Sequence, residues 1–168
     1  DQGVSVSDLF LSPGQAIVET RARNPRESFT FRAARQEEFP GMPMVVLVDE
    51  YSASAAEIVA GALQDHDRAL VVGRPTFGKG SVQTLFQLSG GNYLKMTTGK
   101  WYTPVGRSIQ KEQDPEAQRL QALAEAGIGR TTEVPDTADR EAYRTDSGRI
   151  VYGGGGIVPD VIVPGDSL

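Results

Sequence analysis

Two side chains near the middle of the sequence have the types and surroundings that chemistry requires: Ser54 in "YSASAAEIV" and Lys79 in "GRPTFGKGS". Ser54 follows the apolar run "VVLV" and precedes a segment rich in alanine, leucine and glutamate, a pattern that indicates a strand turning into a helix. A hydroxyl at a helix start faces free N–H groups and the positive end of the helix dipole, which together stabilise an oxyanion. A serine nucleophile is therefore possible at this turn.

The same letters also fit a structural role. Ser54 and Glu57 form the capping-box pattern S-x-x-E, and most serines at such positions only cap helices. Ser52 is an alternative candidate, both for the nucleophile and for the helix cap. From spacing alone, capping and catalysis both stay open.

A serine nucleophile needs a base, and the one histidine of the chain is badly placed for that task. His66 follows Ser54 across the predicted helix, which puts the two about 18 Å apart at 1.5 Å per residue. Because this exceeds hydrogen-bond reach, we expect His66 to be a surface residue at the helix C-terminus. The base is then a carboxylate or a lysine.

Lys79 is a candidate base because its sequence neighbours are short of polar groups, with no acid from Arg74 through Gly91. An ordinary lysine has a pKa of about 10.4, and burial beside apolar groups lowers such a value, so we expect a catalytic lysine here to be buried. Lys95 and Lys100 lie in alternating segments and are expected to reach solvent.

The letters around Lys79 also resemble a phosphate-binding loop, G-x-x-x-x-G-K-[ST], in which Gly73 and Gly78 would fit. Gly80, however, stands where the loop needs a hydroxyl, and Pro75 removes a backbone N–H. The following "SVQTLFQL" favours a strand, whereas the loop requires a helix. We therefore do not expect a nucleotide site.

A β-α-β unit over residues 43–73 is expected to position Ser54 and Lys79. The run "MVVLVDE" predicts a buried, parallel strand, Ala55–Gln64 a buried helix, and "ALVVG" a second buried strand. Parallel neighbours joined by one helix end at the same edge of their sheet, and this brings the two residues together.

The flanking segments predict β-hairpins around this unit. Residues 15–34 form one around "RNPR", and "SVQTLFQL" with "YLKMTTGKWYT" form another around "SGGN". Further on, residues 114–127 predict a short helix, residues 128–147 an exposed polar excursion, and "GRIVYGGGGIVPDVIV" two strands around a glycine turn. The expected class is α/β in one domain.

Composition excludes several classes of function. The net charge is −5 with no basic block, so nucleic acid is a poor candidate for a partner. With no cysteine and one histidine, cysteine-metal and multi-histidine sites are excluded. No apolar run approaches the roughly 18 residues of a membrane span, and no signal peptide is recognisable.

Three segments in order resemble the catalytic core of the C-terminal processing peptidases, or tail-specific proteases: "VVLVDEYSASAAEIVAGALQDHDRALVVGRPTFGKGSVQT", "LKMTTGKWYTPVGRSIQ" and "GGGGIVPDV". The resemblance covers Val45–Gln110 and Arg149–Val161. It implies a ClpP/crotonase-like α/β fold and a serine endopeptidase with a serine-lysine dyad that needs no metal or cofactor.

The resemblance also implies a role for each site residue. Ser54, and not Ser52, would be the nucleophile, and Lys79 the general base. Gln83 would orient the lysine, and the N–H of Ala55 would be one oxyanion donor.

Substrates implied by the resemblance are proteins or peptides with apolar C-terminal segments, and the implied location is the cell envelope, periplasmic or otherwise extracytoplasmic. The family's upstream Asn-Pro-Gly-Gly turn, which gives a second oxyanion donor, and its PDZ domain have no counterpart here. We therefore expect residues 1–168 to be a peptidase core truncated at its N-terminus, with residues 111–148 as an inserted surface element. A peptide-binding domain with an idle dyad, or an inactive fragment, is the alternative, and the oligomeric state is not indicated.

Overall fold

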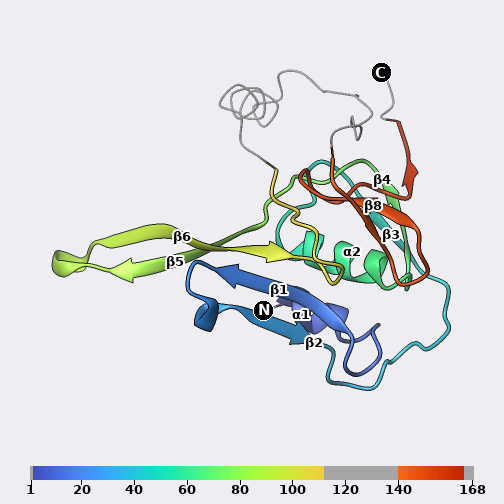
Figure 1. The fold of residues 1–168 in the computed structure, drawn as a ribbon, viewed down its shortest axis with the longest axis horizontal. Coiled ribbons are helices and arrows are strands. Elements are labelled where there is room, and N and C mark those ends of the chain that lie inside the picture. The colour runs from blue at the N-terminus through green and yellow to red at the C-terminus, as the bar shows by residue number, and fades with distance from the viewer. Residues whose placement is uncertain (1, 112–139, 165–168) are drawn as a thin grey trace.

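The computed structural model describes residues 2–111 and 140–164, and Figure 1 shows its fold. In these ranges the helices are α1 (Gln2–Ser7) and α2 (Ala55–Asp65), with two 3-10 turns, η1 (Pro25–Glu27) and η2 (Ser89–Gly91). The strands are β1 (Ala16–Ala22), β2 (Phe29–Arg32), β3 (Val45–Val48), β4 (Leu70–Gly73), β5 (Ser81–Gln87), β6 (Tyr93–Tyr102), β7 (Ala142–Arg144), β8 (Ile150–Tyr152) and β9 (Val161–Ile162). The architecture is mixed α/β.

The predicted β-α-β unit is present. Strands β3 and β4 pair in parallel, from Val45 opposite Leu70 to Val48 opposite Gly73, and α2 connects them. The expectation that β3 is buried is wrong, because Val45 is 58% exposed and Leu47 is 78% exposed. The reason is that β3 is an edge of the three-stranded sheet β3-β4-β9, and the packed side chains of this strand are those of the alternate positions.

A second sheet, in the order β2-β1-β6-β5, contains both predicted hairpins. Strand β1 pairs with β2 and with β6, and β5 pairs antiparallel with β6 from Ser81 opposite Lys100 to Gln87 opposite Tyr93. The distal part of the β5–β6 hairpin extends away from the rest of the molecule (Figure 1). Because β5 begins directly after Gly80, the loop that carries Lys79 connects the two sheets.

Helix α2 lies between the two sheets (Figure 1) and supplies much of the core. One face packs against Ile17 and Val18 of β1, and another contributes Ala60 to a cluster with Val71 and Ile157. The sequence did not predict α1, which packs against α2. Gly3 permits this approach, because a Cβ at that position would lie 2.8 Å from the main-chain oxygen of Ala55.

The C-terminal region contains a third, two-stranded sheet. The two strands predicted over residues 149–163 are confirmed as β8 and β9, but β7 also forms and pairs antiparallel with β8. The expectation of an exposed excursion is therefore confirmed only in part for residues 140–147, because most of them are exposed but β7 is a strand and Thr145 is buried. The predicted helix over residues 114–127 and the start of that excursion lie outside the described residues. Among the helices that are described, none has the length and apolar character to span a membrane.

Candidate active site

Ser54 occupies the turn from β3 into α2, with φ +55° and ψ −110°. The only other non-glycine residue with positive φ in the described ranges is Asp67. A helix cap normally has an extended backbone, so capping does not require the strain that the Ser54 conformation carries. A strained strand-to-helix turn that presents a serine is the geometry of a nucleophile elbow, and it favours chemistry over capping alone.

The first turn of α2 includes a donor, directly beside Ser54, without a partner in the part of the chain that the structure describes. The N–H of Ala56 donates to Ala53 O at 3.1 Å, and that of Ile58 donates to Ser54 O at 3.0 Å. The N–H of Ala55 makes no hydrogen bond with any residue in the described ranges. A free N–H at the positive end of a helix dipole is suited to bind an oxyanion.

Glu57 connects Ser54 to the loop that carries Lys79. Its carboxylate is fully buried, and Oε2 accepts the main-chain N–H of Ser54 at 2.8 Å and that of Lys79 at 2.9 Å. Oε1 accepts the N–H of Gly78 at 2.7 Å and the hydroxyl of Thr76 at 2.5 Å. The carboxylate therefore fixes the backbone after β3 and the backbone after β4 in one arrangement.

The sequence predicted Glu57 only as part of a cap. The missed signal is that a carboxylate in the first turn of a largely apolar, buried helix needs several hydrogen-bond donors around it. Those donors had to come from another segment, and here they come from the loop after the neighbouring strand.

The lysine loop is held close to the serine turn, as the parallel strands predicted. Phe77 donates its N–H to Ser52 O at 3.0 Å, and Ser54 and Lys79 share one acceptor oxygen of Glu57. The expected burial of Lys79 is wrong, because the residue is exposed. Its main chain faces the carboxylate, while its ammonium group makes no ion pair or hydrogen bond with another residue that the structure describes.

The two glycines beside Lys79 are needed for packing. Gly78 has φ +87°, and a Cβ there would lie 2.7 Å from the Cβ of Lys111. A Cβ at Gly80 would lie 2.7 Å from the main-chain nitrogen of Gln110. The loop can therefore pass residues 109–111 only with glycine at both positions.

A phosphate-binding role for this loop is disfavoured by the same contacts. The N–H groups of Gly78 and Lys79, which would have to contact a phosphate, already bind the Glu57 carboxylate. The segment after Gly80 is strand β5, as predicted, and a phosphate loop needs a helix there.

The side chains of the other polar candidates from the sequence analysis are not part of this hydrogen-bonded arrangement. Gln83 lies on β5 opposite Thr97 and is exposed, and its side chain makes no hydrogen bond with Lys79 or another described residue. The hydroxyl of Ser52 donates to Asp49 Oδ1 at 3.1 Å and accepts the Asp49 N–H, which makes it a turn residue. Lys95 and Lys100 are exposed, as predicted.

His66 lies at the C-cap of α2, which confirms its predicted position at the opposite end of the helix from Ser54. It is not the surface residue that we expected, because its side chain is only 9% exposed. Its Nδ1 lies 2.7 Å from Asp146 Oδ2, and its Nε2 lies 2.7 Å from Ala16 O. His66 therefore joins α2 to β1 and to the turn between β7 and β8.

A buried ion pair fastens the segment after β6 to α2. Arg107 and Asp65 are both fully buried, with Nη2 of the arginine 2.6 Å from Oδ1 of the aspartate. Burial lowers the pKa of Arg107, although the charge of Asp65 acts in the opposite direction. The same Nη2 donates to Gln64 Oε1 at 2.6 Å. These contacts fix where residues 107–111 run past the lysine loop.

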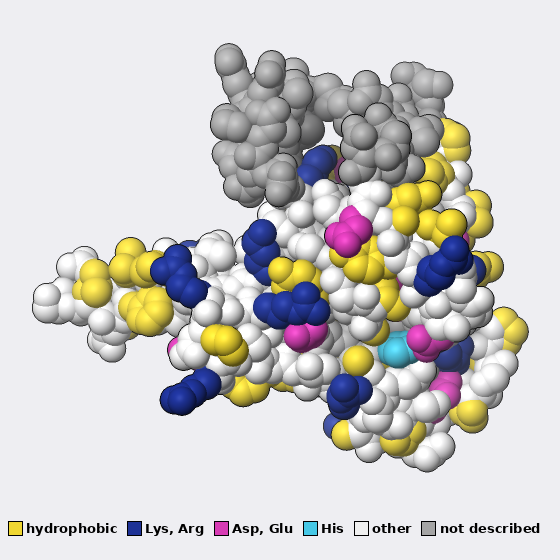
Figure 2. Space-filling model, in the orientation of Figure 1, with side chains coloured by type: hydrophobic (Ala, Val, Ile, Leu, Met, Phe, Trp, Pro, Cys, Tyr) yellow, Lys and Arg dark blue, Asp and Glu magenta, His cyan; other side chains and the backbone are white. Residues whose placement is uncertain are grey.

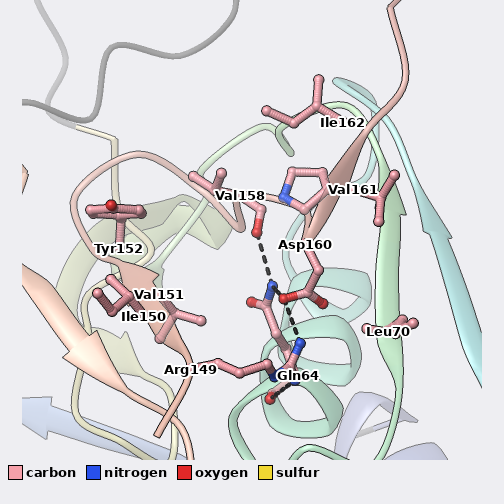
Figure 3. A pocket seen from close by; sticks show the side chains of 11 residues that line it. Gln64, Leu70, Arg149, Ile150, Val151, Tyr152, Val158, Asp160, Val161 and Ile162 are labelled. Atoms are coloured by element: carbon pink, nitrogen blue, oxygen red, sulfur yellow. Dashed lines mark hydrogen bonds and ion pairs between the residues drawn. The ribbon is translucent and has the colours of Figure 1, made fainter.

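A cavity of about 500 Å³ lies by the last turn of α2, and Figure 3 shows its lining. Three of its polar side chains are paired: Gln64 Nε2 donates to Val158 O at 2.9 Å, and Arg149 forms an ion pair with Asp160 at 2.7 Å. Because Gln64 is in the last turn and Ser54 precedes the first, this cavity is not part of the candidate active site.

Charge on the face shown in Figure 2 is mixed, with lysine and arginine side chains scattered among acidic ones. No basic patch for nucleic acid gathers there, in agreement with the net charge of −5.

Comparison with known proteins gives one consistent result. A family model described as "Peptidase family S41" matches residues 1–118. The chain is 49% identical over 110 residues to the carboxy-terminal-processing protease of Bartonella bacilliformis, an alignment that covers 66% of this chain and 25% of that protein. It is 42% identical over 109 residues to the carboxyl-terminal-processing protease of a Synechocystis species, and this alignment covers 65% of this chain and 25% of that protein.

Among solved structures, the chain is similar to the photosystem II D1 C-terminal processing protease, with a TM-score of 0.65 and 26% identity. This similarity covers 96% of the chain and 30% of that protein. The chain thus spans about a quarter of the length of the two curated relatives.

Proposed function

Because the chain belongs to peptidase family S41, we propose that it carries the active site of a serine endopeptidase, with Ser54 as nucleophile and Lys79 as general base. The observation that supports this most is the shared contact with Glu57, whose Oε2 accepts the main-chain N–H of both residues. The positive φ of Ser54 adds to it, because a cap alone does not need that conformation.

The proposed reaction is acyl transfer. Lys79, in its neutral form, takes the proton of Ser54 Oγ as this oxygen attacks the peptide carbonyl, and the Ala55 N–H stabilises the oxyanion. The protonated amine then gives a proton to the leaving amine, and the C–N bond breaks. Water, activated by the same amine, hydrolyses the acyl-enzyme. Gln83 is proposed to orient the lysine once substrate is bound.

The exposure of Lys79 sets a requirement for this mechanism, since a lysine in water is ordinarily an ammonium group at neutral pH, and an ammonium group cannot accept a proton. We propose that bound substrate covers the lysine and turns its amine toward Ser54. The main chain needs no rearrangement for this step, because Glu57 already holds it.

We further propose protein substrates cleaved near their C-termini, with apolar residues near the cut, by a core of the ClpP/crotonase type. Within the described residues, the β5 edge that faces away from β6 is unpaired and begins directly after the lysine loop, so an extended peptide could add to it. Residues 111–148 are proposed as an inserted surface element, and the cell envelope as the location.

The second candidate is a peptide-binding domain with an idle dyad, and the exposed Lys79 favours it. A fluorogenic peptide with an apolar C-terminus separates the two functions. An endopeptidase cleaves it, and Ser54→Ala and Lys79→Met each lower turnover by at least about 10³-fold. A binding domain shifts the peptide's fluorescence anisotropy without cleavage, and both variants then bind as the parent does.

A further inference from the structure

The side chain of Gln110 contacts the loop that carries Lys79 from a segment 30 residues further along the chain. Its Oε1 accepts the main-chain N–H of Gly80 at 3.0 Å, and its Nε2 donates to Lys111 O at 2.8 Å. The N–H of Lys111 in turn donates to Gly78 O at 3.0 Å. The residues on both sides of Lys79 are thus bonded to one short segment.

Gln110 completes the set of acceptors for this loop. The N–H of Thr76 donates to Ile157 O and that of Phe77 to Ser52 O, while those of the next two residues donate to Glu57. Gly80 is the last donor before β5, and it is buried. Without the Gln110 oxygen, the N–H of Gly80 would be buried without a hydrogen-bond partner. This costs free energy and favours a displaced loop.

Gly80 is also held at its carbonyl group, which belongs to the next peptide unit. Its carbonyl oxygen accepts the main-chain N–H of Trp101 at 2.7 Å. A Cβ at Gly80 would lie 2.9 Å from Ile109 Cγ1, so the backbone already sits in close contact with the segment that carries Gln110. Gln110 and Trp101 therefore fix the two peptide units on either side of the Gly80 Cα, and the first of these units follows the Lys79 Cα, from which the lysine side chain leaves the backbone.

The fold does not depend on Gln110 to hold its own segment in place. Ile109 is 2% exposed within the core, and Arg107 forms the buried ion pair with Asp65. Gln110 itself is only partly buried, and outside its own segment its side-chain contact is with the lysine loop.

We propose that Gln110 is a positioning residue for the general base: its side-chain oxygen fixes the Gly80 peptide and so holds the Lys79 backbone where the amine reaches Ser54 once substrate is bound. This rests on the function proposed above for Ser54 and Lys79. The Glu57 carboxylate holds the peptide before Lys79, and Gln110 holds the peptide after it.

The test compares variants that keep or remove the acceptor, in protein expressed from its complete gene. Gln110→Leu and Gln110→Met lack the oxygen, and we expect kcat to fall about ten- to a hundredfold with KM changed less than twofold. Gln110→Glu keeps an oxygen at the same reach and is expected to retain kcat within about threefold. Gln15→Leu is the control, because Gln15 Oε1 accepts the Ser12 N–H at 2.8 Å in the same manner, in the loop before β1.

Equal losses in the Leu, Met and Glu variants would overturn the proposal, as would an unchanged kcat in Gln110→Leu. Folding is checked through Trp101, the single tryptophan, whose Nε1 donates to Ser81 O at 3.1 Å. If the parent shows no turnover that depends on Ser54, the proposed function fails, and amide hydrogen exchange then decides the contact itself. Exchange at Gly80 at least tenfold faster in Gln110→Leu than in Gln110→Glu, with Lys79 unchanged, supports it; equal rates overturn it.

Discussion

The main-chain N–H of Lys79 donates to Glu57 Oε2 at 2.9 Å, across 22 residues of sequence. The same oxygen accepts the Ser54 N–H, so a single buried carboxylate sets the separation between the backbones of the two proposed catalytic residues. A helix cap of this kind would ordinarily serve only its own helix. Here it also determines where the second segment of the site lies.

Replacing Glu57 with glutamine is expected to weaken both the fold and the site. Each carboxylate oxygen accepts two hydrogen bonds, at least one of them from a main-chain N–H, so the new NH₂ group faces a main-chain donor whichever way the amide is turned. We expect a loss of about 3 kcal/mol in the free energy of unfolding, measured in urea, and a large loss of turnover. Glu50→Gln is the control, since Glu50 is 39% exposed and pairs with Arg74 at the surface. Similar stability for the two variants would contradict the role given to Glu57.

Gly80→Ala is expected to abolish turnover by displacing the lysine loop. The new Cβ would lie 2.7 Å from Gln110 N and 2.9 Å from Ile109 Cγ1, so one of the two segments must shift. Gly91→Ala provides the comparison, because Gly91 has φ +77° with nothing within 4 Å of a Cβ. It should cost about 1 kcal/mol of stability from backbone strain and leave turnover unchanged. Peptide cleavage and thermal unfolding measure both effects, and an active Gly80→Ala would show that the contact is not needed.

His66→Ala should lower stability without removing the chemistry. The imidazole contacts Ala16 O and Asp146 at the end of α2 remote from Ser54, so its loss releases β1 and the β7–β8 turn from the helix. We expect a lower unfolding temperature and, at a temperature where the variant is folded, kcat within about threefold of the parent. A fall in kcat to the level of Ser54→Ala would identify His66 as the base and refute Lys79.

Asp67 is expected to make folding stability depend on pH in the acid range. Burial alone would raise the pKa of Asp67, but hydrogen bonds from Ser147, Arg149 and Thr145 outweigh it and lower the pKa below its ordinary value. A carboxyl group with a lower pKa in the folded state stabilises that state above about pH 4 and loses this contribution as the pH falls through the folded-state pKa.

The variant Asp67→Asn isolates this contribution, because asparagine also tolerates the φ of +53° found at this position. Urea unfolding should show the parent to be more stable at pH 7, with a difference that shrinks as the pH falls below about 4. A difference that stays constant down to pH 2 would mean that the charge of Asp67 is not involved.

Much of the fold was predictable because the responsible signals are local. Alternating and continuous apolar runs indicated both hairpins and the β3-α2-β4 unit, and that unit placed Ser54 and Lys79 at one sheet edge. Helix α1 was missed because six residues containing Gly3 and two serines have no clear apolar period. The exposure of Leu47 was missed because a continuous apolar run does not reveal whether the outer face of its sheet is covered.

The contacts that complete the candidate site could not be predicted, because they join residues distant in sequence. Thr76 reaches Glu57 across 19 positions and Gln110 reaches Gly80 across 30. The burial expected for Lys79 failed for the same reason: apolar neighbours along the chain do not become neighbours in space when glycines on either side turn the backbone against another segment.

The most direct test of the dyad is covalent labelling of the protein, expressed from its complete gene, with a fluorophosphonate, followed by peptide mass spectrometry. We predict that the label is found on Ser54, and that Lys79→Met slows labelling at least about 10²-fold while its unfolding temperature matches that of the parent. Label on Ser52 or elsewhere, or equal rates of labelling in the parent and in Lys79→Met, would contradict a serine nucleophile activated by Lys79.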